Sequence, residues 1–175
     1  MEKYSNQVSN FKNKYSTTSF KCKTVNQKSI IKSILDDQTI ITVIHGKPGT
    51  GKTYTTLQGV LKEFKQGNYN KIYLSKSVKT LDDKSEDVGF LKGTLEEKIA
   101  PFMFSYDFNF KQIIDSETYT FARQNEIIEF LPLAYIRGIG LNNCIVILDE
   151  SQNINNGVLR TVLSRIGKNS KLIIL

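Results

Sequence analysis

A stretch in the first third of the chain reads Ile40-Ile41-Thr42-Val43-Ile44-His45-Gly46-Lys47-Pro48-Gly49-Thr50-Gly51-Lys52-Thr53. Its first five residues are all β-branched, which predicts a buried strand. The glycines that follow let the backbone curl so that successive N–H groups point inward. Lys52–Gln66 then carries apolar residues at helical spacing and ends before Gly67, which predicts a helix. The spacing Gly-x-x-x-x-Gly-Lys-Thr between a strand and a helix is typical of a loop that binds nucleotide phosphates.

The residues of this loop have distinct chemical uses. Lys52 supplies a point charge for the β- and γ-phosphates, and Thr53 supplies a hydroxyl for Mg²⁺. The N-terminus of the following helix favours anions. We therefore expect ATP and Mg²⁺ as cofactors. The residues expected to contact the nucleotide are Gly46, Lys47, Pro48, Gly49, Thr50, Gly51, Lys52, Thr53 and Tyr54.

A second buried strand, Cys144–Leu148, ends in two acidic residues. In a parallel sheet ligands bind at the carboxyl ends of strands, so these acids are expected beside the phosphate loop. Asp149 would hold Mg²⁺ through water, and Glu150 would polarise the attacking water. Gln152 could sense the γ-phosphate or link the nucleotide to a second site. The alternative for the two acids is a strand that ends in polar residues because it reaches solvent, and the alternative for Gln152 is a solvated polar loop.

The remaining elements alternate between strands and helices, which predicts an α/β fold with a parallel sheet flanked by helices. Residues 1–20 are polar and predict a loosely ordered arm before a domain over 21–175. The other expected elements are a helix over Gln27–Asp36 capped by Asn26, a strand over Lys71–Leu74, a helix over Leu95–Ala100 that Pro101 bends or ends, an undecided helix or strand–helix mixture over Thr118–Glu129, a helix over Asn156–Arg165 and a strand over Lys171–Leu175.

Composition narrows the class of protein. A hydrophobic content of 39% and a charged content of 23% are ordinary for a globular protein. The net charge of +7 favours a polyanionic partner such as nucleic acid, although cations near a phosphate site are expected in any nucleotide binder. Cys22 and Cys144 are isolated, which predicts neither a disulfide framework nor a zinc site. No apolar run approaches the roughly 20 residues of a membrane span, so we expect no association with a membrane and a cytoplasmic location. The sequence leaves open whether the chain forms a homo-oligomer.

Together these features resemble the PhoH family of P-loop ATPases, which are relatives of the superfamily 1 helicases. The resemblance covers most of residues 25–175 and implies a RecA-like core that binds ATP and hydrolyses it together with RNA or single-stranded DNA. The family is often described as phosphate-starvation inducible, which concerns regulation. The stretches that carry the resemblance are Gly46–Thr53, Val88–Pro101, Leu131–Gly138, Val146–Asn153 and Leu163–Gly167.

The resemblance also implies roles for matching positions. Gln27 is similar to the adenine-reading glutamine of helicases, or is only a polar residue at a helix start. Arg137 would face phosphate or nucleic acid, or is a surface cation. Gly89 and Gly93 would approach a polynucleotide backbone, or permit tight turns. Lys76 stands where the family usually has arginine, which would remove a bidentate phosphate contact.

The last strand marks the largest departure from the family. The resemblance implies that Lys171–Leu175 lies centrally, between the strand of the phosphate loop and the acidic strand. Family members continue with a further sheet segment and a later arginine that could serve as an arginine finger in hydrolysis. A chain ending at Leu175 would lack both and would expose a sheet edge. We therefore expect such a chain to hydrolyse ATP weakly or not at all. A nucleotide-binding module without useful turnover is therefore the alternative function. A small-molecule kinase would need an arginine-rich lid, and residues 76–125 contain only Arg123.

Overall fold

The central sheet is entirely parallel within the residues that the computed structural model describes, which are 2–16, 20–77 and 95–175. Its strand order is β1-β5-β4-β2-β3. The predicted α/β fold is confirmed, and the last strand lies between β1 and β4 as a RecA-like core requires. The strands are β1 (Ile41–Val43), β2 (Lys71–Lys76), β3 (Ile128–Phe130), β4 (Cys144–Asp149) and β5 (Lys171–Ile174).

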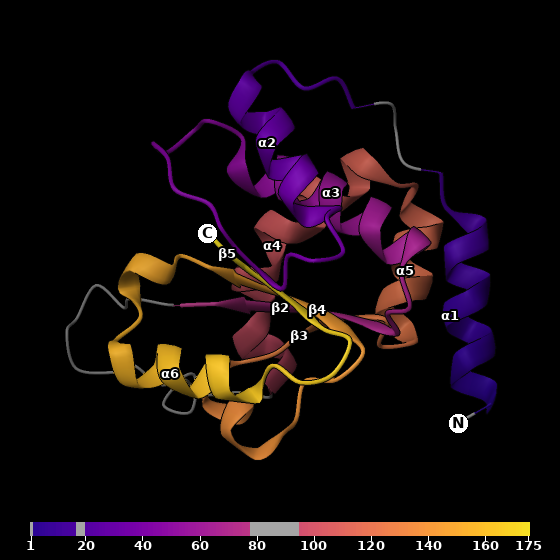
Figure 1. Ribbon diagram of the computed structural model, residues 1–175. Helices are drawn as coiled ribbons and strands as arrows, with labels where there is room; N and C mark the ends of the chain where they lie inside the picture. The colour runs from indigo at the N-terminus through magenta and orange to yellow at the C-terminus, as the bar shows by residue number, and fades with distance from the viewer. Residues whose placement is uncertain (1, 17–19, 78–94) are drawn as a thin grey trace.

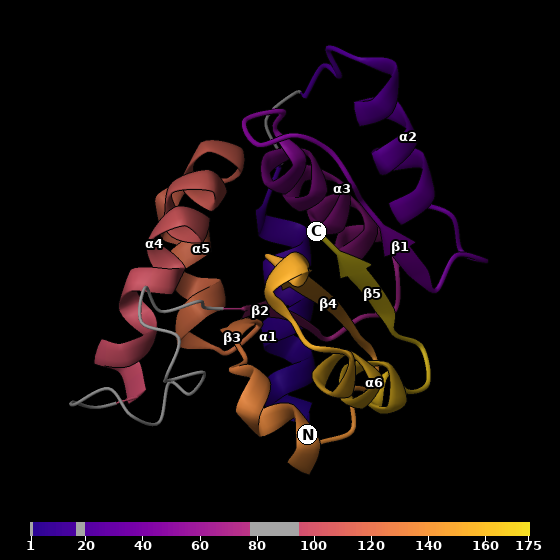
Figure 2. The ribbon, with the colours of Figure 1, turned by 90° about the vertical axis from the view of Figure 1, so that its left-hand side faces the viewer.

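Helices cover both faces of this sheet (Figures 1 and 2). Alternate side chains of β4 supply both apolar clusters, since Ile145 and Ile147 belong to one and Val146 and Leu148 to the other. This explains why β4 is buried along its whole length. The first face carries α1 (Glu2–Lys14), α2 (Val25–Ile34), α3 (Lys52–Gln66), α4 (Leu95–Ile113) and α5 (Ser116–Gln124). The second face carries the 3-10 helix η2 (Leu133–Gly138) and α6 (Asn156–Arg165).

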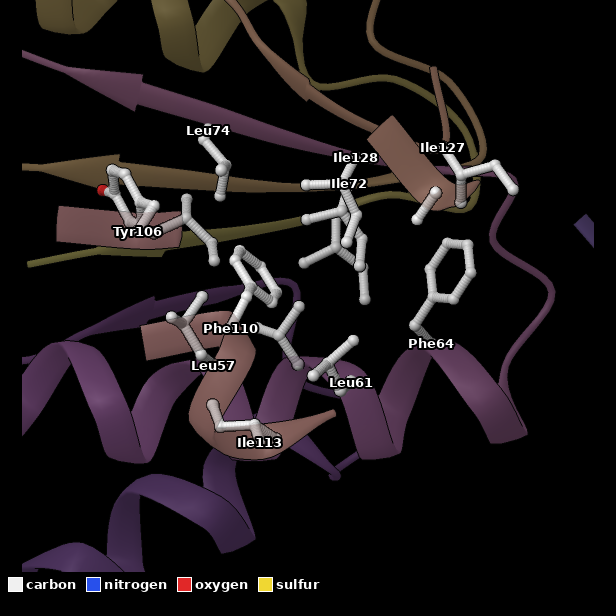
Figure 3. Close-up of a cluster of buried hydrophobic side chains, with 14 of the residues drawn as sticks. Leu57, Leu61, Phe64, Ile72, Leu74, Tyr106, Phe110, Ile113, Ile127 and Ile128 are labelled. Carbon is white, nitrogen blue, oxygen red and sulfur yellow. The ribbon is translucent and has the colours of Figure 1, made fainter. Parts of the chain in front are cut away.

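The contact between α3 and the sheet forms the centre of the larger cluster (Figure 3). Leu57, Leu61 and Phe64 recur at helical spacing along α3 and are fully buried. Ile72 and Leu74 of β2 lie across the cluster from α3, and Phe64 lies next to Ile127 (Figure 3). Burying an apolar side chain of this size contributes about 1.5–3 kcal/mol. This packing holds α3, and therefore the loop that precedes it, in a set position over the sheet.

Several predicted boundaries agree with the structure and one helix start does not. Helices α3 and α6 have the predicted bounds. The undecided region Thr118–Glu129 divides into α5 and β3, with Glu126 at a positive φ of 55° between them. Helix α2 begins earlier than predicted, because the side chain of Thr24 rather than Asn26 accepts a hydrogen bond from the Gln27 N–H at 3.2 Å.

Pro101 was expected to bend or end a short helix, but α4 continues through it to Ile113. Proline in a helix interior removes one hydrogen bond and costs about 3 kcal/mol. Met103, Tyr106 and Phe110 follow at helical spacing and are buried, as is Ile113. Their burial outweighs the cost of the proline, since each contributes about 1.5–3 kcal/mol.

The expectation of a loosely ordered arm is wrong for residues 2–14, which form α1. Val8, Phe11 and Tyr15 lie at helical spacing on one side and are buried against the domain. The Tyr15 hydroxyl donates to the carbonyl of Leu61, and the Lys65 ammonium donates to the carbonyl of Tyr15 at 2.7 Å. These buried side chains, with the partly buried Tyr4, dock the helix on the domain even though most of the segment is polar.

Strand β1 is less buried than the sequence predicted. Thr42 is buried, whereas Ile41 is 44% exposed and Val43 is 69% exposed. Within the described ranges β1 pairs with β5 alone, so it lies at an edge of the sheet. β-Branched residues are favoured in edge strands as well as central ones, so composition did not distinguish the two positions.

A buried ion pair joins the start of β5 to the helices above it. The ammonium of Lys171 lies 3.0 Å from a carboxylate oxygen of Glu63 on α3. It also donates to the carbonyls of Ile34 at 2.7 Å and Asp36 at 3.0 Å, which uses all three of its N–H groups. Glu63 accepts a second hydrogen bond from the hydroxyl of Tyr69 at 3.0 Å. This network attaches both α2 and α3 to the sheet.

Candidate nucleotide site

The loop between β1 and α3 has the backbone geometry that phosphate binding needs. Gly49 and Gly51 adopt positive φ angles of 74° and 79°, which glycine adopts without strain. Gly51 is also the N-cap of α3, and its carbonyl accepts a hydrogen bond from the Thr55 N–H at 2.9 Å. The first N–H groups of a helix have no partner within the helix and carry a partial positive charge. The exposed loop therefore presents these groups where an anion can reach them.

Lys52 reaches back across this loop. Its ammonium donates to the carbonyl of Gly46 at 2.7 Å and to that of Lys47 at 3.2 Å. The hydroxyl of Thr50 donates to the same Lys47 carbonyl at 2.9 Å. A phosphate oxygen is a stronger acceptor for an ammonium than a neutral carbonyl is. The side chain is thus placed to exchange these carbonyls for phosphate.

Gln27 lies against the phosphate loop, although it is distant in sequence. Its side-chain amide donates to the carbonyl of Thr50 at 3.4 Å and accepts from the Lys23 N–H at 2.8 Å. Tyr54, in the first turn of α3, meets the ring of Phe20 edge-on with 5.6 Å between centroids. Phe20 was not among the predicted site residues, and its only sequence signal is that it is an aromatic residue in a polar segment.

The two oxygens of the Asp149 carboxylate are both held. One accepts from the Glu150 N–H at 2.9 Å, and the other accepts from the hydroxyl of Tyr106 at 2.9 Å. Burial, followed by the charge of Asp149, raises the pKa of Tyr106 well above its usual value, so its hydroxyl stays a donor. Tyr106 lies on α4, and sequence reasoning missed it because nothing local distinguishes it from other buried aromatic residues.

Glu150 and Gln152 contact each other directly. Glu150 adopts a left-handed conformation with a φ of 55°, which is uncommon for a residue with a Cβ. The exposed Gln152, in the 3-10 helix η3 (Ser151–Asn153), donates its side-chain amide to a carboxylate oxygen of Glu150 at 2.5 Å. The two polar side chains therefore form a unit at the end of β4.

The phosphate loop and the acidic residues both lie at the carboxyl ends of the parallel strands, which form one edge of the sheet. Strand β5 lies between β1 and β4, with hydrogen bonds from the Ile44 N–H to the Ile174 carbonyl and from the Leu175 N–H to the Leu148 carbonyl. Adjacent strands are about 4.8 Å apart, so the strand ends before the loop and at Asp149 are separated by about 10 Å. That span suits phosphates, Mg²⁺ and its water ligands.

The donors at this edge fit Mg²⁺. Thr53 supplies a hydroxyl and Asp149 a carboxylate, and Mg²⁺ prefers such hard oxygen ligands while keeping several waters. No group of three or more His, Cys, Asp or Glu residues that could hold a metal is found among the described residues. Mg²⁺ usually keeps several waters and binds substrate phosphates, which would supply its other ligands here.

The remaining predicted residues are distributed differently. Lys76 pairs in register with Asp149, which places it at the same sheet edge. Arg137 is exposed on η2, on the face of the sheet opposite α3. Gly89 and Gly93 lie outside the described residues.

Comparison with known proteins gives one consistent family. The family model described as PhoH-like protein matches residues 19–175. A PhoH-like protein of Bacillus subtilis is 31% identical over 89% of this chain and 47% of its own length. A PhoH-like protein of Mycobacterium tuberculosis is 34% identical over 87% of this chain and 42% of its own, and the protein PhoH2 of Thermobispora bispora is 30% identical over 85% and 34%. The chain thus spans less than half the length of these curated relatives.

Within the described ranges, no helix combines the length and the apolar character needed to cross a membrane.

Proposed function

We propose that this chain, which belongs to the PhoH-like protein family, binds ATP with Mg²⁺ and hydrolyses the γ-phosphate in concert with RNA or single-stranded DNA. The observation that carries the proposal is the position of Lys52 and Thr53 at the same sheet edge as Asp149 and Glu150, one strand apart. The loop supplies an ammonium and a hydroxyl, and the end of β4 supplies two carboxylates. Phosphoryl transfer to water uses such groups to bind phosphate and Mg²⁺ and to orient the attacking water.

Each residue of the site has a proposed role. Lys52 and the loop N–H groups bind the β- and γ-phosphates, while Thr53 and Asp149 hold Mg²⁺. When bound, the ion would neutralise charge that develops on the phosphates. Glu150 accepts a proton from the attacking water, and Gln152 orients Glu150 through the hydrogen bond between them. Gln27 contacts the adenine, because it lies against the loop with its amide at the Thr50 carbonyl.

Glu150→Gln is expected to lower ATP turnover by about two to four orders of magnitude while ATP binding is retained. The amide keeps the shape of the side chain but cannot accept the proton, and general-base catalysis contributes about 10²–10⁴-fold. Phosphate release measures turnover, and a fluorescent ATP analogue measures binding separately. Glu117→Gln, which changes the charge identically at an exposed position on α5, is the matched control and should leave both unchanged.

Nucleotide binding without useful turnover is the second candidate function. It is favoured by the contacts of the two charged groups, since Lys52 is bonded to loop carbonyls and Glu150 to Gln152. Both must rearrange before they act on a γ-phosphate. If the unaltered chain binds ATP but releases phosphate no faster than the Glu150→Gln variant, with or without RNA, hydrolysis is excluded and this second function stands.

Binding of single-stranded RNA or DNA is expected to weaken steeply with salt, because the chain carries a net charge of +7. Each phosphate contact contributes a slope of about −0.7 to log K against log salt for single strands. Fluorescence anisotropy of matched RNA and DNA oligonucleotides between about 50 and 200 mM salt gives this slope. If the exposed Arg137 contacts one phosphate, Arg137→Gln should make the slope of log K against log salt less negative by about 0.7.

A flat salt dependence for both oligonucleotides would contradict phosphate contacts, and a difference between them would identify the preferred nucleic acid.

The cytoplasmic location expected from the sequence belongs to the same proposal. In this reading the isolated Cys22 and Cys144 remain reduced; both are free in the structure.

A further inference from the structure

We propose that Tyr106 is a positioning residue for Asp149, and that its hydroxyl sets the carboxylate in the orientation that holds Mg²⁺ beside the phosphate loop. The inference rests on the proposed function of the site. Tyr106 is fully buried, and its hydroxyl lies 2.9 Å from one oxygen of Asp149. It reaches the site from α4, an element inserted between β2 and β3.

The pattern of hydrogen bonds on Asp149 supports this role. An ionised carboxylate offers about four lone-pair directions. The Glu150 N–H takes one on the first oxygen and the Tyr106 hydroxyl takes one on the second. Counting bonds from the described residues alone, each oxygen therefore keeps a free direction for water or a metal ion, while rotation of the carboxylate would break a bond on either side. A group that bonds a ligating carboxylate in this way tunes the metal affinity of that carboxylate.

The packing around Tyr106 makes it a rigid support. Met103 and Phe110, one turn before and one turn after it on α4, are buried in the same cluster. Figure 3 shows Tyr106 at one end of this cluster, close to Leu74 of β2. Phe110, also on α4, lies beside Leu57 of α3. Apolar contacts on α4 and β2 therefore hold the ring of Tyr106, and the ring fixes the position of the hydroxyl. Loss of the hydroxyl alone removes the hydrogen bond but leaves those contacts.

A second tyrosine supplies a matched comparison. Tyr119 on α5 is also buried, and its hydroxyl donates to the carboxylate of Asp107 on α4. This pair has the same chemistry as Tyr106 and Asp149 but belongs to the contact between α4 and α5. If buried tyrosine–carboxylate bonds served only to stabilise α4, removal of either hydroxyl would have the same consequences.

The experiment compares Tyr106→Phe with Tyr119→Phe and the unaltered chain. Binding of a fluorescent ATP analogue is titrated at a series of Mg²⁺ concentrations and again with EDTA, and thermal unfolding is recorded for each protein. We expect Tyr106→Phe to raise the Mg²⁺ concentration needed for half-maximal tightening of nucleotide binding by about tenfold to a hundredfold. Its affinity for metal-free nucleotide should not change. Tyr119→Phe should leave the Mg²⁺ dependence unchanged, whatever its effect on thermal stability.

A double variant tests whether Tyr106 acts through Asp149. Tyr106→Phe added to Asp149→Asn should shift the Mg²⁺ dependence no further than Asp149→Asn alone. Equal Mg²⁺ dependence in Tyr106→Phe and Tyr119→Phe would overturn the inference while leaving the proposed function intact. Failure of the unaltered chain to bind nucleotide at any Mg²⁺ concentration would overturn the proposed function, and the inference with it.

Discussion

Lys52→Ala is expected to lower the affinity for ATP with Mg²⁺ by at least about thirtyfold. Loss of one partner of a close charge pair costs about 2–5 kcal/mol, and each 1.4 kcal/mol is about tenfold in affinity. The ammonium of Lys52 is the cation that the structure places inside the phosphate loop, bonded to the carbonyls of Gly46 and Lys47. Isothermal titration calorimetry with a non-hydrolysable ATP analogue measures the affinity directly.

The matched control for this variant is Lys62→Ala. Lys62 is exposed on the same helix, so the change in net charge and helix composition is identical while the phosphate loop is untouched. Thermal unfolding without nucleotide should be similar in the two variants, because the bonds of Lys52 are made to exposed loop carbonyls. An ATP affinity that survives Lys52→Ala would show that the loop does not bind phosphate as proposed.

Lys171→Met is expected to lower the free energy of unfolding by about 3–5 kcal/mol, which is the usual cost of breaking a buried ion pair from one side. The side chains of Lys171 and Glu63 are only 6% and 4% exposed. The variant would leave the Glu63 carboxylate without its cation and the carbonyls of Ile34 and Asp36 without their donor. Urea denaturation followed by circular dichroism measures the change.

Two further variants separate burial from charge in this result. Glu117→Gln breaks an exposed pair with Lys14 and should cost less than about 1 kcal/mol. Glu63→Met combined with Lys171→Met should recover much of the lost stability, since an apolar pair of similar volume removes the unpaired charge. A cost below about 1 kcal/mol for Lys171→Met alone would mean that the network does not hold α2 and α3 to the sheet.

The features of the candidate site whose structural context the sequence predicted are local in the chain. The loop from Gly46 to Thr53 is a continuous pattern between a strand and a helix, and the structure shows that context, with α3 beginning at Lys52. The acidic strand end was predicted for the same reason, because a run of apolar residues leads directly into Asp149 and Glu150. Backbone sterics and helix periodicity act over a few residues, so such features are visible without a fold.

Apart from the start of α2, which depends on a local cap, the features that were missed depend on distant partners. Helix α1 was mistaken for a loose arm because its buried Val8 and Phe11, with Tyr15 just after the helix, become significant only when α3 and α5 provide a surface to receive them. Pro101 was expected to bend or end the helix; it does not end it, because the compensating burial comes from strands and helices elsewhere in the chain. The exposure of β1 depends on its place at the sheet edge, which strand composition does not encode.

By itself, the sequence determined that this chain has a Gly-x-x-x-x-Gly-Lys-Thr loop between a strand and a helix, an alternating α/β order and the family to which it belongs. Only the tertiary structure decided which groups surround that loop. Tyr106 reaches Asp149 across 43 positions of sequence, and Lys171 reaches the carbonyl of Ile34 across 137. The physical reason is that such bonds form where buried polar groups must find partners. Which groups meet there depends on the packing of the whole sheet and its helices.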